Sequence, residues 1–303
     1  MGNLKYLGPL AIVCAAVLWS FDGLLRQYLS DVPSLMVVLL EHFFGALLLT
    51  PLLFKGWQEI KTLSNRAWIS VIWVSLFGGL LGTFFYTKAL SYINYIDLSV
   101  VVLLQKFQPF FAIGLAAVLL REPLTKNYLI CAVAAIAGGY LVTFESGLPV
   151  MEMDDKTLIA GLMALCAAFA WGSSTVLGKH ALKHLSFFSL TGLRLWITTS
   201  ITVVVILFMS NSPMEGSLNK TEWFIILTIV LSTGTVALFI YYYGLKHVFA
   251  THATIYELFW PLSAMLIDLF IRGRTLMPAQ FIGALLLVGA SIFLSRQHKN
   301  SIS

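Results

Sequence analysis

Ionisable side chains lie inside long apolar segments of this chain, and these residues have the chemistry to bind a polar ligand. Lys106 and Glu257 are the leading pair, and each comes a few residues before a proline. A charged group near the centre of a bilayer costs roughly 3 kcal/mol, so such groups usually face a cavity or a partner. Lys106 could bind a carboxylate and Glu257 an ammonium. The pair therefore predicts a binding site for a small zwitterion.

The prolines that follow these two residues predict two kinked helices. A proline inside a helix frees a backbone carbonyl, and a bilayer tolerates this where a cavity or a neighbouring helix satisfies the carbonyl. Polar and aromatic residues precede the two prolines, namely Gln105, Lys106 and Gln108 before Pro109, and Tyr256, Glu257 and Trp260 before Pro261. All of these except Gln108 are candidate substrate-binding residues. Polar groups beside kinks at similar positions suit a site at mid-depth. A structural kink without a ligand is the alternative.

Four aromatic residues are further candidates for substrate binding: Trp19, Trp171, Tyr86 and Tyr241. Aromatic faces attract apolar or cationic ligands, and the NH and OH groups of Trp and Tyr orient polar ones. The alternative is that these rings pack in the core or form an interfacial belt.

Glu41, His42 and Arg194 are candidates for a proton or charge relay within the membrane. An imidazole titrates near neutral pH, which suits proton transfer. The alternatives are structural. Glu41 could pair with Lys106, and His42 and Arg194 could be satisfied by helix ends or loop carbonyls.

The elements that must position these residues form an internal repeat. A shift of 152 residues places Trp171 on Trp19 and Pro261 on Pro109. Under a shift of 155 residues the equivalent pairs are Gly79 with Gly234 and Tyr86 with Tyr241. Each copy contains five apolar segments, and an odd number makes the two copies face opposite ways across a bilayer. Inverted repeats of this kind build many secondary transporters.

The composition indicates a membrane protein, because 59% of residues are hydrophobic and 11% are charged, against about 25% charged in a soluble domain. The sequence predicts ten transmembrane helices near residues 7–25, 35–54, 67–89, 97–119, 127–144, 157–178, 187–209, 222–244, 252–271 and 278–295. Each is near the length of about 20 residues that crosses a bilayer. Asp22 and Arg26 fall at a predicted membrane boundary, where we expect solvated or snorkelling side chains.

The inverted arrangement also sets the depth of the leading pair. It places Lys106 toward the outer side of Pro109 and Glu257 toward the inner side of Pro261. With a rise of about 1.5 Å per residue, the two charges differ in depth by roughly 10 Å. They are therefore too far apart for an ion pair, but a zwitterion fits between them.

Loop charges predict that both termini are cytoplasmic, because eleven Lys and Arg residues then lie inside against six outside. We expect a first five-helix repeat over residues 1–146, an acidic linker over 147–156 on the outer face, and a second repeat over 157–303. The net charge of +5 is interpreted as a topology signal and not as nucleic-acid affinity.

The ordered motifs resemble the EamA-type members of the drug/metabolite transporter superfamily. The matching segments are Ala15–Ser20, Ala167–Gly172, Tyr86–Leu90, Tyr241–Leu245 and the Leu-Arg-Glu-Pro-Leu run at 120–124. The sequence departs from the family pattern at His42, where an arginine is usual. The resemblance implies a ten-helix carrier in a bacterial inner membrane, without a cofactor or metal. It also implies a central cavity lined by the first, third and fourth helices of each repeat.

The predicted function is secondary active transport of a small polar metabolite by alternating access, with an amino acid or similar zwitterion exported or exchanged. Proton-coupled uptake of a different metabolite is the alternative. The sequence contains no His-Glu-x-x-His or Gly-x-Ser-x-Gly motif, which argues against a membrane-embedded enzyme, and no recognisable selectivity filter, which argues against a channel. We expect a monomer or homodimer that lies in the lipid bilayer and binds a small-molecule substrate.

Overall fold

The computed structural model describes residues 4–90, 104–105, 107–143, 155–208, 218–272 and 275–300, and the regular elements within these ranges are all helical. The first half contains α1 (Leu4–Ser20), α2 (Asp22–Gln27), α3 (Ser34–Lys55), α4 (Trp57–Lys61), α5 (Asn65–Trp73), η1 (Val74–Leu81), α6 (Gly82–Leu90), α8 (Gln108–Leu115), η2 (Ala116–Leu120) and α9 (Lys126–Thr143). The second half contains α10 (Asp155–Ala181), α11 (Phe187–Phe208), α12 (Lys220–Ile229), η3 (Val230–Gly234), α13 (Thr235–His247), α14 (Ala250–Tyr256), α15 (Phe259–Arg272) and α16 (Pro278–Asn300). The all-α fold class is confirmed.

Eight of the ten predicted segments are helices that are long and apolar enough to cross a membrane. The other two predicted segments are those that contain Pro109 and Pro261. The segment predicted at 97–119 lies partly outside the described residues, and its described part forms the shorter apolar helix Gln108–Leu120. The segment predicted over 252–271, with a kink at Pro261, is divided into α14 and α15.

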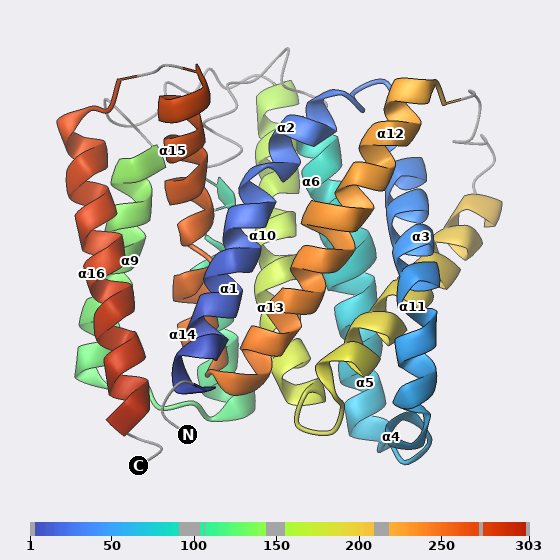
Figure 1. Cartoon of the computed structure of the whole chain (residues 1–303), viewed down its shortest axis with the longest axis horizontal. Helices are drawn as coiled ribbons and strands as arrows, with labels where there is room; N and C mark the ends of the chain where they lie inside the picture. Colours follow the sequence, from blue (N-terminus) through green and yellow to red (C-terminus); the bar gives the residue numbers. More distant parts are fainter. Residues whose placement is uncertain are drawn as a thin grey trace.

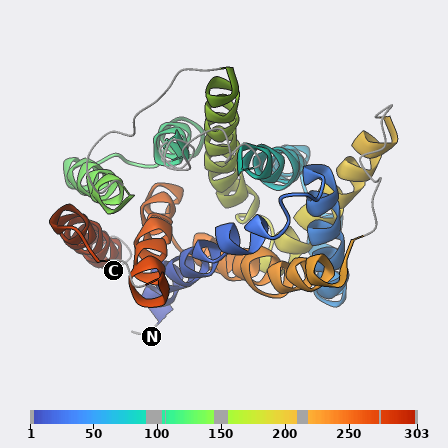
Figure 2. The ribbon, with the colours of Figure 1, turned by 90° about the horizontal axis from the view of Figure 1, so that it is seen from above.

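The two halves run in opposite directions, as the odd number of segments predicts. Figure 1 shows α1 rising from the end of the bundle where both termini lie, whereas α10 descends toward that end. Equivalent helices then pack across the halves in reciprocal pairs: α1 packs on α13, and α6 packs on α10. Figures 1 and 2 place the α9–α16 pair at one end of the elongated bundle and the α3–α11 pair at the other.

π-helical turns occur at equivalent places in the two halves. The segments η1 and η3 interrupt the third membrane-crossing helix of each repeat, and both contain a member of the Gly79–Gly234 repeat pair. A π-helical turn changes the direction of side chains along a helix and is frequent at functional sites. Because a π-helical turn occurs in both copies, η1 and η3 mark equivalent regions of the two repeats.

The break between α14 and α15 follows from Pro261. Because proline has no N–H, it cannot bond the carbonyl four residues earlier, which belongs to Glu257. That carbonyl instead accepts a hydrogen bond from the backbone N–H of Trp260 at 3.0 Å. The N-terminus of α14 is fixed from the other half, since the buried carboxylate of Glu122 accepts from the backbone N–H groups of Ala250 and Thr251 at 2.8 and 2.9 Å. Glu257 is thus held at a break that directly follows an anchored helix.

Replacing Gly138 with alanine is expected to force α9 and α16 apart. A Cβ atom at Gly138 would lie 2.6 Å from the backbone oxygen of Gly283 and 2.9 Å from the backbone nitrogen of Leu287, and backbone atoms cannot rotate away. Overpacking of this kind costs about 1–3 kcal/mol. We expect a lower melting temperature in detergent, whereas Gly289→Ala, which meets no heavy atom within 4 Å, should leave it unchanged. An unchanged melting temperature for Gly138→Ala would contradict this close contact.

Candidate functional site

A cavity of about 190 Å³ lies between the two halves. One water molecule needs about 10–15 Å³ by the same measure, so the cavity has room for an organic ligand. Its wall contains the charged or titratable residues Asp22, Arg26, Glu41, His42, Arg194 and Glu257, together with aromatic, amide and hydroxyl side chains. The second helix of each repeat contributes Glu41, His42 and Arg194, which extends the lining that the family resemblance implies.

The aromatic part of the wall repeats the internal symmetry of the chain. Trp19 of α1 contacts Tyr241 of α13 with ring centroids 5.1 Å apart. Tyr86 of α6 contacts Trp171 of α10 with centroids 5.2 Å apart. Each pair joins one half to the other, and the sequence repeat exchanges the two pairs. The cavity therefore has two equivalent aromatic walls, which we call the aromatic frame.

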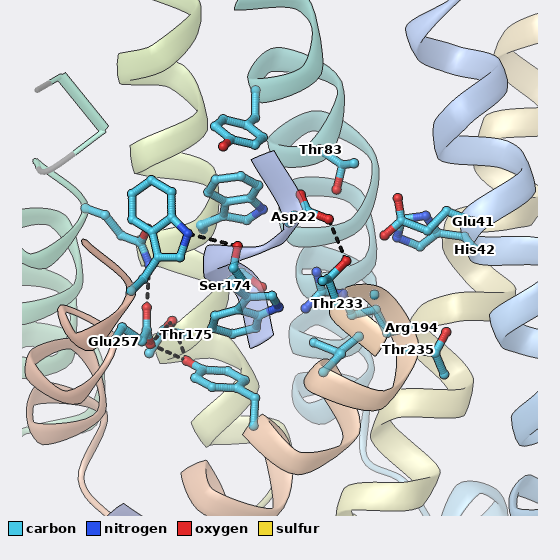
Figure 3. A pocket seen from close by; sticks show the side chains of 18 of the residues that line it. Asp22, Glu41, His42, Thr83, Ser174, Thr175, Arg194, Thr233, Thr235 and Glu257 are labelled. Atoms are coloured by element: carbon cyan, nitrogen blue, oxygen red, sulfur yellow. Dashed lines mark hydrogen bonds between the residues drawn. The ribbon is translucent and has the colours of Figure 1, made fainter. Parts of the chain in front are cut away.

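Glu257 lies at one side of the cavity among neutral hydrogen-bond donors (Figure 3). Its carboxylate accepts from the hydroxyl of Tyr241 and from Nε2 of Gln108, both at 2.6 Å, and from Oγ1 of Thr175 at 3.4 Å. Among the described residues, no Lys or Arg forms a salt bridge with it. Nearby, the indole N–H of Trp260 donates to the backbone oxygen of Trp19 at 2.9 Å, so the break between α14 and α15 is tied to α1.

A buried ionic cluster forms another part of the wall. The guanidinium of Arg26 binds the carboxylate of Asp22 at 2.5 Å and that of Glu41 at 2.8 Å. Thr233 of η3 donates to Asp22 at 2.7 Å (Figure 3). The prediction that Asp22 and Arg26 are solvated at a membrane boundary is wrong, because α1 ends at Ser20 and α2 turns both side chains into the cavity. The described cationic partner of Glu41 is Arg26.

Arg194 and His42, which are equivalent in the repeat, have different surroundings. Arg194 donates to the hydroxyl of Tyr242 at 2.8 Å and to the backbone oxygen of Gly78 at 2.6 Å, so its bonded partners are neutral. Nδ1 of His42 bonds the backbone oxygen of Val38 at 2.8 Å. Glycine is needed at position 78 because an added Cβ would lie 2.1 Å from Oγ of Ser174. The π-helical segment η1 thereby brings a backbone carbonyl to the guanidinium.

Comparison with known proteins gives the site a family context. The chain matches the EamA-like transporter family twice, over residues 6–144 and 158–296. It belongs to this family. It is 39% identical over 293 residues to the "Riboflavin transporter ImpX" of Fusobacterium nucleatum subsp. nucleatum (strain ATCC 23726 / VPI 4351), with 95% of this chain and 97% of that protein covered.

Two more distant similarities are consistent with this assignment. The "Uncharacterized transporter YoaV" of Bacillus subtilis (strain 168) is 22% identical over 258 residues, which cover 84% of this chain and 85% of that protein. A solved structure titled "Crystal structure of protein" shares 17% identity with a TM-score of 0.76, covering 98% of this chain and 99% of that one. At that identity it supports the fold alone. The protein is therefore a multi-pass membrane transporter of the EamA-like family.

In this EamA-like transporter, most of the predicted site residues meet at one cavity. The predicted residues that line it are Trp19, Glu41, His42, Tyr86, Gln105, Trp171, Arg194, Tyr241, Glu257 and Trp260. Tyr256, the last residue of α14, is instead buried in the apolar core and does not line the cavity. Lys106 lies outside the described residues. The roles of these residues in binding stay predictions.

Sequence reasoning missed several polar residues of the EamA-like cavity. The spacing of Asp22 and Arg26 by four positions is typical of a helical ion pair, and this signal could have indicated that the two belong together. The remaining missed residues are hydroxyl side chains, namely Thr83, Ser174, Thr175, Thr233 and Thr235. Apolar helices contain many Ser and Thr residues that bond their own backbone, so no sequence signal separates these five from the rest.

Proposed function

We propose that this EamA-like transporter moves riboflavin or a closely related flavin by alternating access. The observation that supports the proposal most directly is the aromatic frame, in which Trp19 with Tyr241 and Trp171 with Tyr86 form two walls of one cavity. A flavin has a planar heteroaromatic ring system, which suits contact with aromatic faces. The relative named a riboflavin transporter is 39% identical over nearly the whole of both chains.

The polar residues of the cavity suit the rest of a flavin. Riboflavin has an imide edge on its ring and a chain of hydroxyl groups, and it has no formal charge at neutral pH. The cavity supplies amide groups from Gln105 and Gln108 and hydroxyl groups from Ser174, Thr233 and Thr235. Because Asp22 and Glu41 already bind Arg26, these three charged groups do not require an ionic ligand. The relatives give no support to the amino-acid substrate that the sequence predicts.

We also propose the placement of the chain in the cell. The two domains are residues 1–146 and 157–303, joined by the acidic linker 147–156, and both termini are cytoplasmic in a bacterial inner membrane. This proposal rests on the loop charges, with eleven basic residues on one side and five on the other once Arg26, which lies in the cavity wall, is left out. Cysteine labelling from outside the cell tests it, because a cysteine in the linker should react, and one placed after Arg296 should not.

Transport can be tested with the purified protein in liposomes. We expect saturable riboflavin flux that is stimulated by unlabelled riboflavin on the opposite side, because a carrier exchanges its substrate. We also expect riboflavin to raise the melting temperature, since a ligand that binds the folded state stabilises it. Saturable flux of another metabolite without any riboflavin flux would overturn the proposed substrate.

Substituting Trp19 with leucine is expected to weaken riboflavin binding about 3- to 10-fold, because an aromatic contact contributes about 0.5–1.5 kcal/mol beyond its buried area. The measurement is a titration of flavin fluorescence with the purified variant. Trp223 of α12 provides the matched control, because it is a partly exposed tryptophan outside the cavity wall. Equal weakening by Trp223→Leu would show that the loss does not come from the aromatic frame.

A further inference from the structure

Glu257 differs from the other carboxylates of the cavity wall because no described cation bonds it. Asp22 and Glu41 both bind Arg26, whereas the described partners of Glu257 are neutral. The sequence predicts a depth difference of roughly 10 Å between Glu257 and Lys106, which lies outside the described residues. The side chain of Glu257 is partly exposed and lines the cavity, so water in the cavity reaches it. A carboxylate inside a membrane is stable without a cation when it binds a proton.

The Arg, Asp and Glu residues of the described cavity wall balance in charge only when Glu257 is neutral. Arg26 and Arg194 are positive and Asp22 and Glu41 are negative, so these four residues have no net charge. Figure 3 shows Glu41 and Arg194 across the cavity from Glu257. Riboflavin has no formal charge at neutral pH, so it does not neutralise a carboxylate. A proton on Glu257 does.

The other ionisable side chains around α14 have partners of their own. Among the described residues, those that bond α14 or the chain just before and after it are Glu122, Tyr128, Lys179 and Tyr241. Glu122 and Tyr128 bond backbone groups at the start of α14, and Lys179 donates to carbonyls at the end of α13. His42 lies on α3 across the cavity and bonds a backbone carbonyl (Figure 3). Tyr241 is therefore the described ionisable group that bonds Glu257.

The hydrogen bonds around Glu257 can form in either protonation state. The hydroxyl of Tyr241 donates to Oε1 of Glu257 at 2.6 Å and lies 2.8 Å from the hydroxyl of Thr175. A hydroxyl group both donates and accepts. When Oε1 carries a proton, it can donate to Tyr241, and Tyr241 can donate to Thr175. Gln108 still donates to Oε2 at 2.6 Å. Each of these groups therefore keeps a hydrogen-bond partner when the proton binds and when it leaves.

Tyr241 connects this carboxylate to the aromatic frame. The ring of Tyr241 contacts Trp19 with centroids 5.1 Å apart, whereas its hydroxyl bonds Glu257. A flavin that lies against the frame contacts the ring and leaves the hydroxyl to the carboxylate, so the flavin and the proton do not compete. The flavin also displaces water from the cavity, and loss of water favours a neutral carboxyl group. We therefore expect the flavin and the proton to bind together.

We propose that Glu257 binds a proton that crosses the membrane with each flavin. The inference rests on the proposed function and adds the source of energy and the residue that carries it. On one side of the membrane, a carboxylate oxygen of Glu257 takes a proton from hydronium in the cavity and an O–H bond forms. On the other side that bond breaks, its electron pair stays on the carboxylate, and the proton returns to water. The flavin is released with it.

The test uses the purified protein in liposomes, with the membrane potential held at zero. Exchange is measured as uptake of labelled riboflavin against unlabelled riboflavin at equal pH. Accumulation is measured without internal riboflavin, with the outside more acidic by one pH unit. The unsubstituted protein should accumulate riboflavin up to about tenfold, because one pH unit is a tenfold ratio of proton concentration. Glu257→Gln should still exchange riboflavin but should not accumulate it.

Two control variants separate Glu257 from other titratable groups. Glu222→Gln changes a partly exposed carboxylate outside the cavity and should accumulate riboflavin as the unsubstituted protein does. His42→Asn removes the imidazole from the cavity wall and should keep its response to the pH gradient, even if its exchange is slower.

The pH dependence of riboflavin affinity in detergent provides a second measurement. Because the flavin-bound protein holds one more proton than the free protein, affinity should fall as pH rises, by up to about tenfold per pH unit. Glu257→Gln should remove this dependence. Glu257→Asp keeps a carboxyl group but withdraws it from Tyr241 by one methylene, so the pH range of the change should shift. If Glu257→Gln does not fold, an unchanged range in Glu257→Asp refutes the inference.

The possible failures of the inference and of the proposed function are distinct. If Glu257→Gln accumulates riboflavin, or if the unsubstituted protein exchanges riboflavin without responding to the pH gradient, the proton is not carried by Glu257 and the proposed function stands. Loss of accumulation in His42→Asn but not in Glu257→Gln has the same meaning. If the unsubstituted protein neither binds nor exchanges riboflavin, the proposed function is wrong and the inference falls with it.

Discussion

Replacing Arg26 with leucine is expected to destabilise the protein by about 3–5 kcal/mol, because removal of one partner leaves buried charges without compensation. Arg26 is the described cation that bonds both Asp22 and Glu41, and all three side chains are largely buried. We expect the melting temperature in detergent to fall by on the order of 10 °C. A thermal melt followed by the fluorescence of buried tryptophan or by a thiol-reactive dye measures the change.

A matched control and a compensated variant make this result interpretable. Arg66→Leu removes an exposed arginine from the start of α5 and should change the melting temperature little. Combining Arg26→Leu with Asp22→Asn and Glu41→Gln removes the uncompensated charges and should recover part of the loss. If Arg26→Leu melted at the temperature of the unsubstituted protein, the buried cluster would not contribute to stability in the way proposed.

Replacing Glu257 with leucine is expected to reduce transport about 100-fold while the protein remains folded and inserted. The substitution leaves the donors of Tyr241 and Gln108 without their acceptor, and each lost hydrogen bond to a charged group costs about 1.5–3 kcal/mol. Both donors belong to the cavity wall, so its shape and polarity change together. The measurement is the initial rate of riboflavin flux into liposomes, normalised to the amount of inserted protein.

Two further variants test the same prediction. Glu257→Gln keeps an oxygen acceptor and should retain more flux than Glu257→Leu. Glu222→Gln changes a partly exposed carboxylate that caps α12 outside the cavity and should transport normally. Full transport by Glu257→Leu would remove Glu257 from the site. The sequence also predicts that an apolar residue at Lys106 abolishes transport, and the same assay tests this variant.

Much of the fold could be predicted from the sequence because apolar length and repetition follow from the order of residues alone. Segments near 20 apolar residues predict membrane-crossing helices, and eight of them are confirmed as such. The pairing of Trp19 with Trp171 and of Tyr86 with Tyr241 likewise comes from spacing alone. The reciprocal contacts between these residues, Trp19 with Tyr241 and Tyr86 with Trp171, follow only once the halves pack together.

The segment predicted over 252–271, with a kink at Pro261, is divided into two helices for a reason that the sequence contains. Pro261 removes the N–H that would bond the carbonyl of Glu257, and this makes a break possible without fixing where it occurs. The carboxylate of Glu122, 128 positions before Ala250, accepts the N–H groups at the start of α14. An anchor so distant along the chain is not visible as a local pattern.

The sequence by itself determined that this chain is a helical membrane protein made of two opposed repeats, because hydropathy and repeat register follow from the order of residues along the chain alone. It also determined most of the titratable and aromatic residues available to a binding site. Tertiary structure decided which of them are partners. Thr233 reaches Asp22 across 211 positions of the chain, and Arg26, predicted to be solvated, binds Glu41 inside the cavity wall. Such pairings depend on how the helices pack and rotate, and hydropathy does not encode either one.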